Sequence, residues 1–85
     1  LIYFENGNSA KAKEYFLATI KSKPEFPYVY YALGMLYDKE KKYQEAVSNY
    51  EKFVALAPQD GSVPAIKQRI KVLKNALNNR TGKKK

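Results

Sequence analysis

Tyrosine, lysine and carboxylate side chains are the chemically active groups of this sequence, because it contains neither histidine nor cysteine. Their absence excludes a disulfide framework, a thiolate metal site and any catalytic triad built on imidazole. Asp38 and Glu40 stand beside a run of lysines, which does not favour a catalytic carboxylate pair, and the sequence has no glycine-rich phosphate loop or calcium loop. We therefore expect no enzymatic activity, no catalytic residue, no metal site and no cofactor.

The basic side chains are concentrated at the carboxyl end. All eight acidic residues lie within residues 1–60, whereas the charged residues of 61–85 are all basic, so this end accounts for the net charge of +8. Lys67, Lys71 and Lys74 are spaced to share one face of a helix, opposite its apolar stripe. Such a face can bind anionic lipid or nucleic-acid phosphate. No aromatic residue interleaves with the lysines to stack on bases, and a solvated face is the interpretation that we favour.

Four segments with helical periodicity must position these groups. Prolines separate the segments, and no stretch shows the sustained alternation of a strand. The sequence therefore predicts an all-α fold with helices over about residues 9–22, 28–40, 44–57 and 62–79.

The second predicted helix is apolar on more than one face. One stripe contains Leu33 and Tyr37, and another contains Tyr28, Tyr31 and Met35. A helix of this kind must be covered on two sides or must bind a partner.

An internal repeat of 34 residues decides among possible folds. A shift by this period places Ala12 on Ala46 and Pro24 on Pro58. Paired helices with this period are typical of tetratricopeptide repeats. Residues 27–60 resemble one complete repeat of that family, whose signature sites are here Tyr30, Leu33, Gly34, Tyr37, Ala46, Tyr50, Phe53 and Pro58. The resemblance implies a right-handed helical repeat of antiparallel helix pairs, and it assigns these eight residues to packing.

The rest of the chain is interpreted against the complete repeat at 27–60. Residues 1–26 resemble a partial preceding repeat, 61–79 a capping helix with an outward polar face, and 80–85 a flexible basic tail. The chain begins with Leu1, in the middle of the expected first helix, so we expect it to be an excised piece. Its start therefore does not establish where the protein resides.

The resemblance also implies a binding surface. First helices of such repeats line a concave groove that accepts peptide segments, and the residues at the corresponding positions are Tyr28, Tyr31, Met35 and Asp38, with Leu1 and Phe4 in the partial repeat. Packing of these residues against neighbouring helices is the alternative. The Lys, Asn and Arg clamp by which some members grip a terminal carboxylate is absent, since its sites hold Tyr31, Ala32, Met35, Ser62, Ala65 and Ile66.

These observations favour a scaffold that binds a protein or peptide segment. The alternatives are an adaptor that binds nucleic acid or an anionic membrane through its basic helix, and a structural cap of a longer array. We expect self-association through an incomplete amino-terminal face, where Phe16 and the residues around Ala12 would be poorly covered. Lys41 occupies a turn site at which the family favours glycine, so we also expect a left-handed backbone there.

Overall fold

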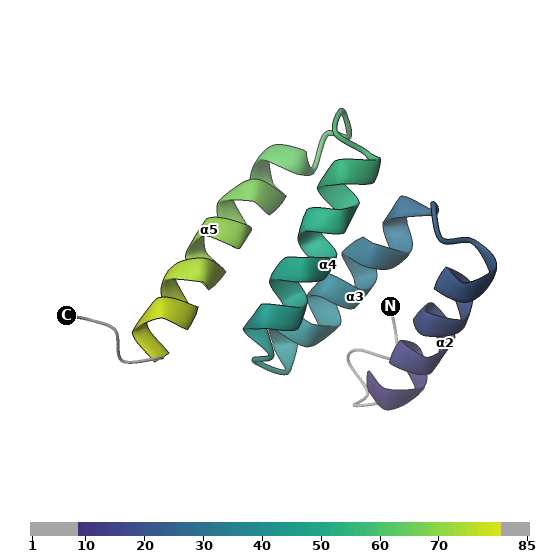
Figure 1. Ribbon diagram of the computed structural model, residues 1–85, viewed down its shortest axis with the longest axis horizontal. Coiled ribbons are helices and arrows are strands. Elements are labelled where there is room, and N and C mark those ends of the chain that lie inside the picture. Colours follow the sequence, from purple (N-terminus) through teal and green to yellow (C-terminus); the bar gives the residue numbers. More distant parts are fainter. Residues whose placement is uncertain (1–8, 81–85) are drawn as a thin grey trace.

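The computed structural model describes residues 9–80, and within that range it contains four helices and no strand. They are α2 (Ser9–Ser22), α3 (Pro27–Lys39), α4 (Tyr43–Leu56) and α5 (Val63–Arg80), and each packs against the next along the chain (Figure 1). The predicted all-α repeat of packed helices is confirmed. Each helix boundary lies within one residue of the predicted position.

Prolines begin and end the central pair of helices. Pro27 is the first residue of α3, where its fixed φ suits the helix and its missing amide N–H is not needed. The Tyr30 hydroxyl donates to the carbonyl of Pro24 at 2.7 Å, which fastens α3 to the loop before it. At the other end, α4 stops at Leu56 shortly before Pro58, which cannot continue a helix.

The turn between α3 and α4 has a left-handed residue that is not glycine. Lys41 has φ 65°, as expected from the sequence. Its amide donates to the Asp38 carbonyl at 3.0 Å and the amide of Lys42 donates to the Tyr37 carbonyl at 2.9 Å. These two bonds form the Schellman pattern that closes a helix, in which glycine usually takes the left-handed position.

Gly34 allows α3 and α4 to approach closely. The sequence suggests that Gly34 and Ala46 are small so that two backbones can meet, and both residues are buried. At Gly34, however, the nearby group is an aromatic ring: a Cβ there would lie 2.5 Å from Cδ1 of Tyr50. Gly34 therefore makes room for the Tyr50 side chain, which in turn fills the space between the helices.

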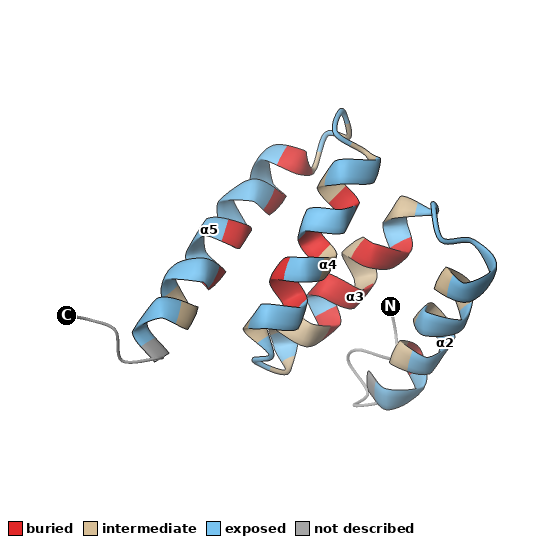
Figure 2. Cartoon of the chain, viewed as in Figure 1, coloured by how far each residue is buried: buried red, intermediate tan, exposed pale blue. Residues whose placement is uncertain are grey.

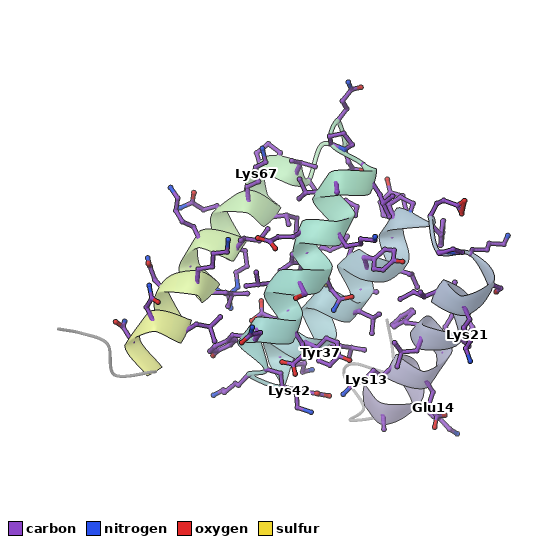
Figure 3. All side chains as sticks on the ribbon, in the orientation of Figure 1. Lys13, Glu14, Lys21, Tyr37, Lys42 and Lys67 are labelled. Atoms are coloured by element: carbon purple, nitrogen blue, oxygen red, sulfur yellow. The ribbon has the colours of Figure 1, made fainter. Side chains whose placement is uncertain are left out.

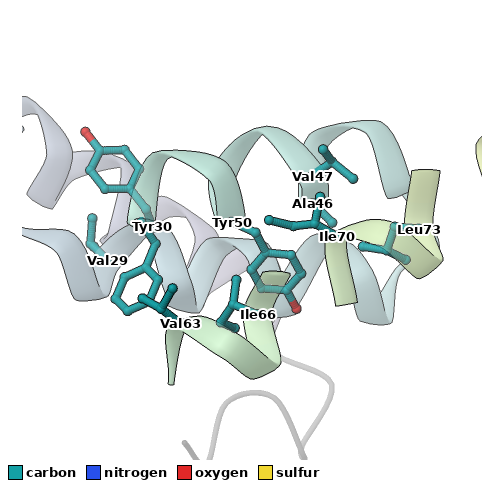
Figure 4. Close-up of a cluster of buried hydrophobic side chains, with 10 residues drawn as sticks. Val29, Tyr30, Ala46, Val47, Tyr50, Val63, Ile66, Ile70 and Leu73 are labelled. Carbon is teal, nitrogen blue, oxygen red and sulfur yellow. The ribbon is translucent and has the colours of Figure 1, made fainter. Parts of the chain in front are cut away.

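The main core lies among α3, α4 and α5. Figure 4 shows its buried side chains converging from the three helices, and Figure 2 shows that α5 is buried only along one side. The apolar stripe of α5 contributes Ile66, Ile70 and Leu73, and Val63 extends it toward the amino end of the helix. The buried residues are Val29, Tyr30, Ala46, Val47, Tyr50, Phe53, Val63, Ile66, Ile70 and Leu73.

A smaller cluster joins α2 to α3, and it corrects one expectation. Ala12 is only 2% exposed because Leu33 and Leu36 of α3 cover it, and Phe16 is half-buried against both clusters. The prediction that this face is poorly covered is therefore wrong. Lys13 adds a polar contact between α2 and the end of α3. Its Nζ lies 2.9 Å from Oε1 of Glu40 and 4.9 Å from the centre of the Tyr37 ring (Figure 3).

Candidate functional site

The second apolar stripe of α3 contains two exposed side chains and one that is partly covered. Tyr28 and Met35 are 49% and 42% exposed. Tyr31 is half-buried, because its ring packs on Phe53 with a centroid separation of 5.1 Å. Tyr31 is thus less accessible than the sequence suggests, whereas Tyr28 and Met35 present large surfaces to solvent.

Tyr28 is held in place at the amino end of α3. Its hydroxyl donates to Oδ2 of Asp60, and its ring lies 5.7 Å from that of Phe53. Oδ1 of Asp60 accepts from both the amide and the hydroxyl of Ser62, at 2.9 and 2.8 Å. These hydrogen bonds, that from Tyr28 first, hold the pKa of the Asp60 carboxyl below its ordinary value. The exposed Tyr28 ring is therefore anchored to the loop that leads into α5.

Asp38 is the centre of a polar network that links three helices. It accepts hydrogen bonds from Nε and Nη2 of Arg69 at 2.8 and 2.7 Å, and from the Tyr50 hydroxyl at 3.1 Å. The Arg69 bonds are the main reason that the pKa of Asp38 is low, although burial opposes them. Burial, and then the Asp38 charge, raises the pKa of Tyr50. The Asp38 side chain, only 14% exposed, is mostly committed to this network.

Arg69 is the residue that sequence reasoning missed. Only Asp38 of this pair was predicted to line a groove, yet Arg69 lies directly beside it and its side chain is 46% exposed. The 34-residue period could have identified it, because the same shift that aligns the repeats places Arg69 on Met35 and Val72 on Asp38. Val72 is likewise exposed, at 45%.

Two rows of side chains therefore form one surface. Residues three or four apart lie on the same side of a helix, and the Asp38–Arg69 contact joins the row on α3 to the row on α5. We call this surface the α3/α5 face, and its members are Tyr28, Tyr31, Met35, Asp38, Ala65, Arg69 and Val72.

The three lysines lie on the other flank of α5. Lys67, Lys71 and Lys74 are all exposed, and Figure 3 shows Lys67 extending from the amino end of the helix. Lys74 pairs with Glu51 of α4 at 3.0 Å. The lysine row thus borders α4 instead of lying directly opposite the apolar stripe, and one of its charges is already partnered.

The remaining predicted positions give no further site. Leu1 and Phe4 lie outside the described residues, as do Lys83 to Lys85. In the described range, no group of three acidic side chains is arranged to hold a metal ion. No described helix is long and apolar enough to cross a bilayer.

Antiparallel helices that pack in sequence, with Gly34 and Ala46 buried between them, define a helical-repeat protein. The family model described as tetratricopeptide repeat matches residues 1–26 and 27–60, which is more than half of the chain. The chain belongs to the tetratricopeptide repeat family, whose members typically bind proteins and are typically not enzymes. No curated protein and no solved structure matched the chain.

Most of the family's signature residues are used in packing. Six of the eight are buried, namely Tyr30, Leu33, Gly34, Ala46, Tyr50 and Phe53. Tyr37 is half-buried and Pro58 is exposed where α4 has ended. The signature therefore accounts for the fold, whereas the α3/α5 face is formed by other residues of the two helices.

Proposed function

We propose that the chain is a protein-interaction module that binds a peptide or protein segment on the α3/α5 face. The observation that carries this proposal is the exposure of Tyr28, Met35 and Val72 on a surface that the core does not need. Covering apolar area of this kind with a partner is favourable by about 25 cal/mol per Å². Tyrosine and methionine suit the role, because one offers a rigid ring with a hydroxyl and the other adapts to varied side chains.

Preorganisation supports the same function. Tyr28 is already held by Asp60 and Phe53, and Tyr31 already rests on Phe53. Binding a partner on these rings would therefore cost less side-chain conformational entropy than binding on side chains that move freely before the partner arrives.

The low pKa values of two carboxyl groups favour binding over catalysis. Asp38 and Asp60 both accept hydrogen bonds from protein groups, which hold their pKa values low. A general acid would need a raised pKa instead. The polar groups of this surface therefore position helices and side chains, and the proposed activity is recognition.

The distribution of apolar and polar residues around α5 supports the proposal that it caps the array. Its apolar side faces α4, while Pro64, Lys67, Gln68 and Lys71 are exposed at the positions that would otherwise carry the packing signature of another repeat. A polar outer face of this kind closes a stack of repeats. In this proposal α5 both closes the array and contributes Arg69 and Val72 to the binding surface.

The test is a selection of peptides from a random display library on the immobilised chain, followed by affinity measurement. Met35→Ser should weaken binding of the selected peptides about fivefold, or roughly 1 kcal/mol. Met35 is a cleaner probe than Tyr31, whose ring supports Phe53. Leu17→Ser is the matched control, because Leu17 is similarly exposed, at 47%, but lies on α2. The proposal is wrong if no peptide is enriched or if the two variants behave alike.

Salt dependence separates this function from binding through the lysine row. Affinity for the α3/α5 face should change little between about 50 and 200 mM salt, whereas contacts to several phosphates lose affinity steeply over that range. A steep loss that Lys67→Gln/Lys71→Gln abolishes would favour the nucleic-acid or anionic-membrane adaptor instead.

A further inference from the structure

Arg69 has one edge bound to Asp38 and a side chain that is nearly half exposed. Asp38 engages Nε and Nη2, which form one edge of the planar guanidinium. The N–H groups of Nη1 lie in the same plane but point away from that edge. The whole side chain is 46% exposed. Within the described part of the chain, Asp38 is the only carboxylate paired with Arg69. The guanidinium is thus held in a fixed orientation with hydrogen-bond donors remaining.

The neighbours of Arg69 along its own helix are apolar. Ala65 and Val72 lie four residues before and three after it, on the same side of α5, and both are exposed. The lysine row lies on the other flank, toward α4, as the Lys74–Glu51 pair shows. On its own helix Arg69 is therefore flanked by apolar side chains, and Asp38 of α3 is its charged neighbour.

The acids of the α3/α5 face and its border are already committed. Asp38 accepts from Arg69 and Tyr50, and Asp60 accepts from Tyr28 and Ser62. Arg69 consequently offers donors for which the described part of this surface provides no further carboxylate. Covering them with a wholly apolar partner would leave them unsatisfied, which is costly.

We propose that the segment bound by the α3/α5 face carries an aspartate or glutamate side chain next to apolar residues, with its carboxylate on Nη1 of Arg69 and its apolar groups on Met35 and Val72. This inference rests on the proposed function and names its partner chemistry. A carboxylate fits better than a phosphate. Asp38 on the opposite edge repels both groups, but it repels a phosphate, with its additional negative charge, more strongly. The fixed orientation of Arg69 reduces the entropy lost on binding.

The experiment uses the library selection on the full chain, with peptides amidated at the carboxyl end so that only side-chain carboxylates are present. Enriched peptides should share an acidic residue beside apolar ones. For the best peptide, replacing Glu by Gln, or Asp by Asn, should weaken binding about three- to tenfold. In the Asp38→Asn/Arg69→Gln double variant, the acidic peptide and its amide counterpart should bind equally.

The double variant is used because Arg69→Gln alone would leave the largely buried Asp38 charge unpaired and would weaken the fold. Lys67→Gln/Lys71→Gln is the matched control, which removes two charges from the other flank of α5 and should preserve the preference for the acidic peptide. Circular dichroism establishes that each variant is folded.

The outcomes distinguish this inference from the proposed function. Enriched peptides without an acidic preference would overturn the inference and leave the binding function standing. The same holds if the preference survives in the Asp38→Asn/Arg69→Gln variant or disappears in the lysine variant. Failure to enrich any peptide would overturn both.

Discussion

Lys41 is the residue at which side chain and backbone are least compatible. Its φ of 65° is reached at little cost only by glycine, and a non-glycine residue there costs on the order of 1 kcal/mol. The bonds from Lys41 and Lys42 that close α3 do not involve a side chain, so glycine would keep them. Lys41→Gly should therefore raise the melting temperature by a few degrees.

Thermal unfolding followed by circular dichroism measures this change. Lys42→Gly is the control, because Lys42 has a φ of −93° that any residue adopts. It should not stabilise the protein, and it removes the same charge. A melting temperature that Lys41→Gly leaves unchanged or lowers would contradict the assignment of strain to this turn.

At the scale of elements, the Asp38–Arg69 pair couples α3 to α5 and makes their association sensitive to acid. The pKa of Asp38 is lower in the folded chain than its unfolded value of about 3.9. Its contribution to stability is therefore fully present above about pH 4 and is lost as the pH falls through the folded pKa. Asp60 behaves in the same direction, because hydrogen bonds from Tyr28 and Ser62 also lower its pKa.

Melting temperatures measured between pH 7 and pH 2 test this coupling. The native chain should lose stability below about pH 4, and Asp38→Asn/Arg69→Gln should lose less, since the contribution of Asp38 is gone. Identical pH profiles for the two proteins would show that the pair contributes no acid sensitivity.

The elements were predictable from the sequence because their signals are local or periodic. Prolines marked helix boundaries, and the 34-residue period identified the helix pairs. The contact between Asp38 and Arg69 was not predicted, since it spans 31 residues and depends on how α5 lies beside α3. The coverage of Ala12 was misjudged for a similar reason, because Leu33 and Leu36 of α3 close that face. Side-chain rotamers, such as that placing the Tyr50 ring over Gly34, are set by packing that the pattern does not encode.

At the scale of the molecule, α2 exposes apolar side chains at the end of the described chain opposite to the basic helix α5. Helices α2 and α5 lie at opposite ends of the described chain, as Figure 1 shows. The residues from α5 onward carry the whole net charge of +8. On α2, by contrast, Tyr15 and Leu17 are 67% and 47% exposed. Because they are two residues apart, Tyr15 and Leu17 lie on opposite flanks of α2. Two copies that meet through the Tyr15 flank, the more exposed of the two, would bury apolar surface and keep their basic ends apart.

We therefore predict that the chain self-associates through α2, as a dimer about a two-fold axis, since identical surfaces usually meet in this way. Light scattering coupled to size-exclusion chromatography, over micromolar to millimolar concentrations, measures the mass. Association should strengthen with added salt, because salt screens the remaining repulsion between the two basic ends. Tyr15→Ser should shift the chain toward monomer, whereas Leu17→Ser on the opposite flank of α2 and Met35→Ser on the α3/α5 face should not. A monomer at every concentration would contradict the prediction, and a dimer that only Met35→Ser disrupts would place the contact on the α3/α5 face instead.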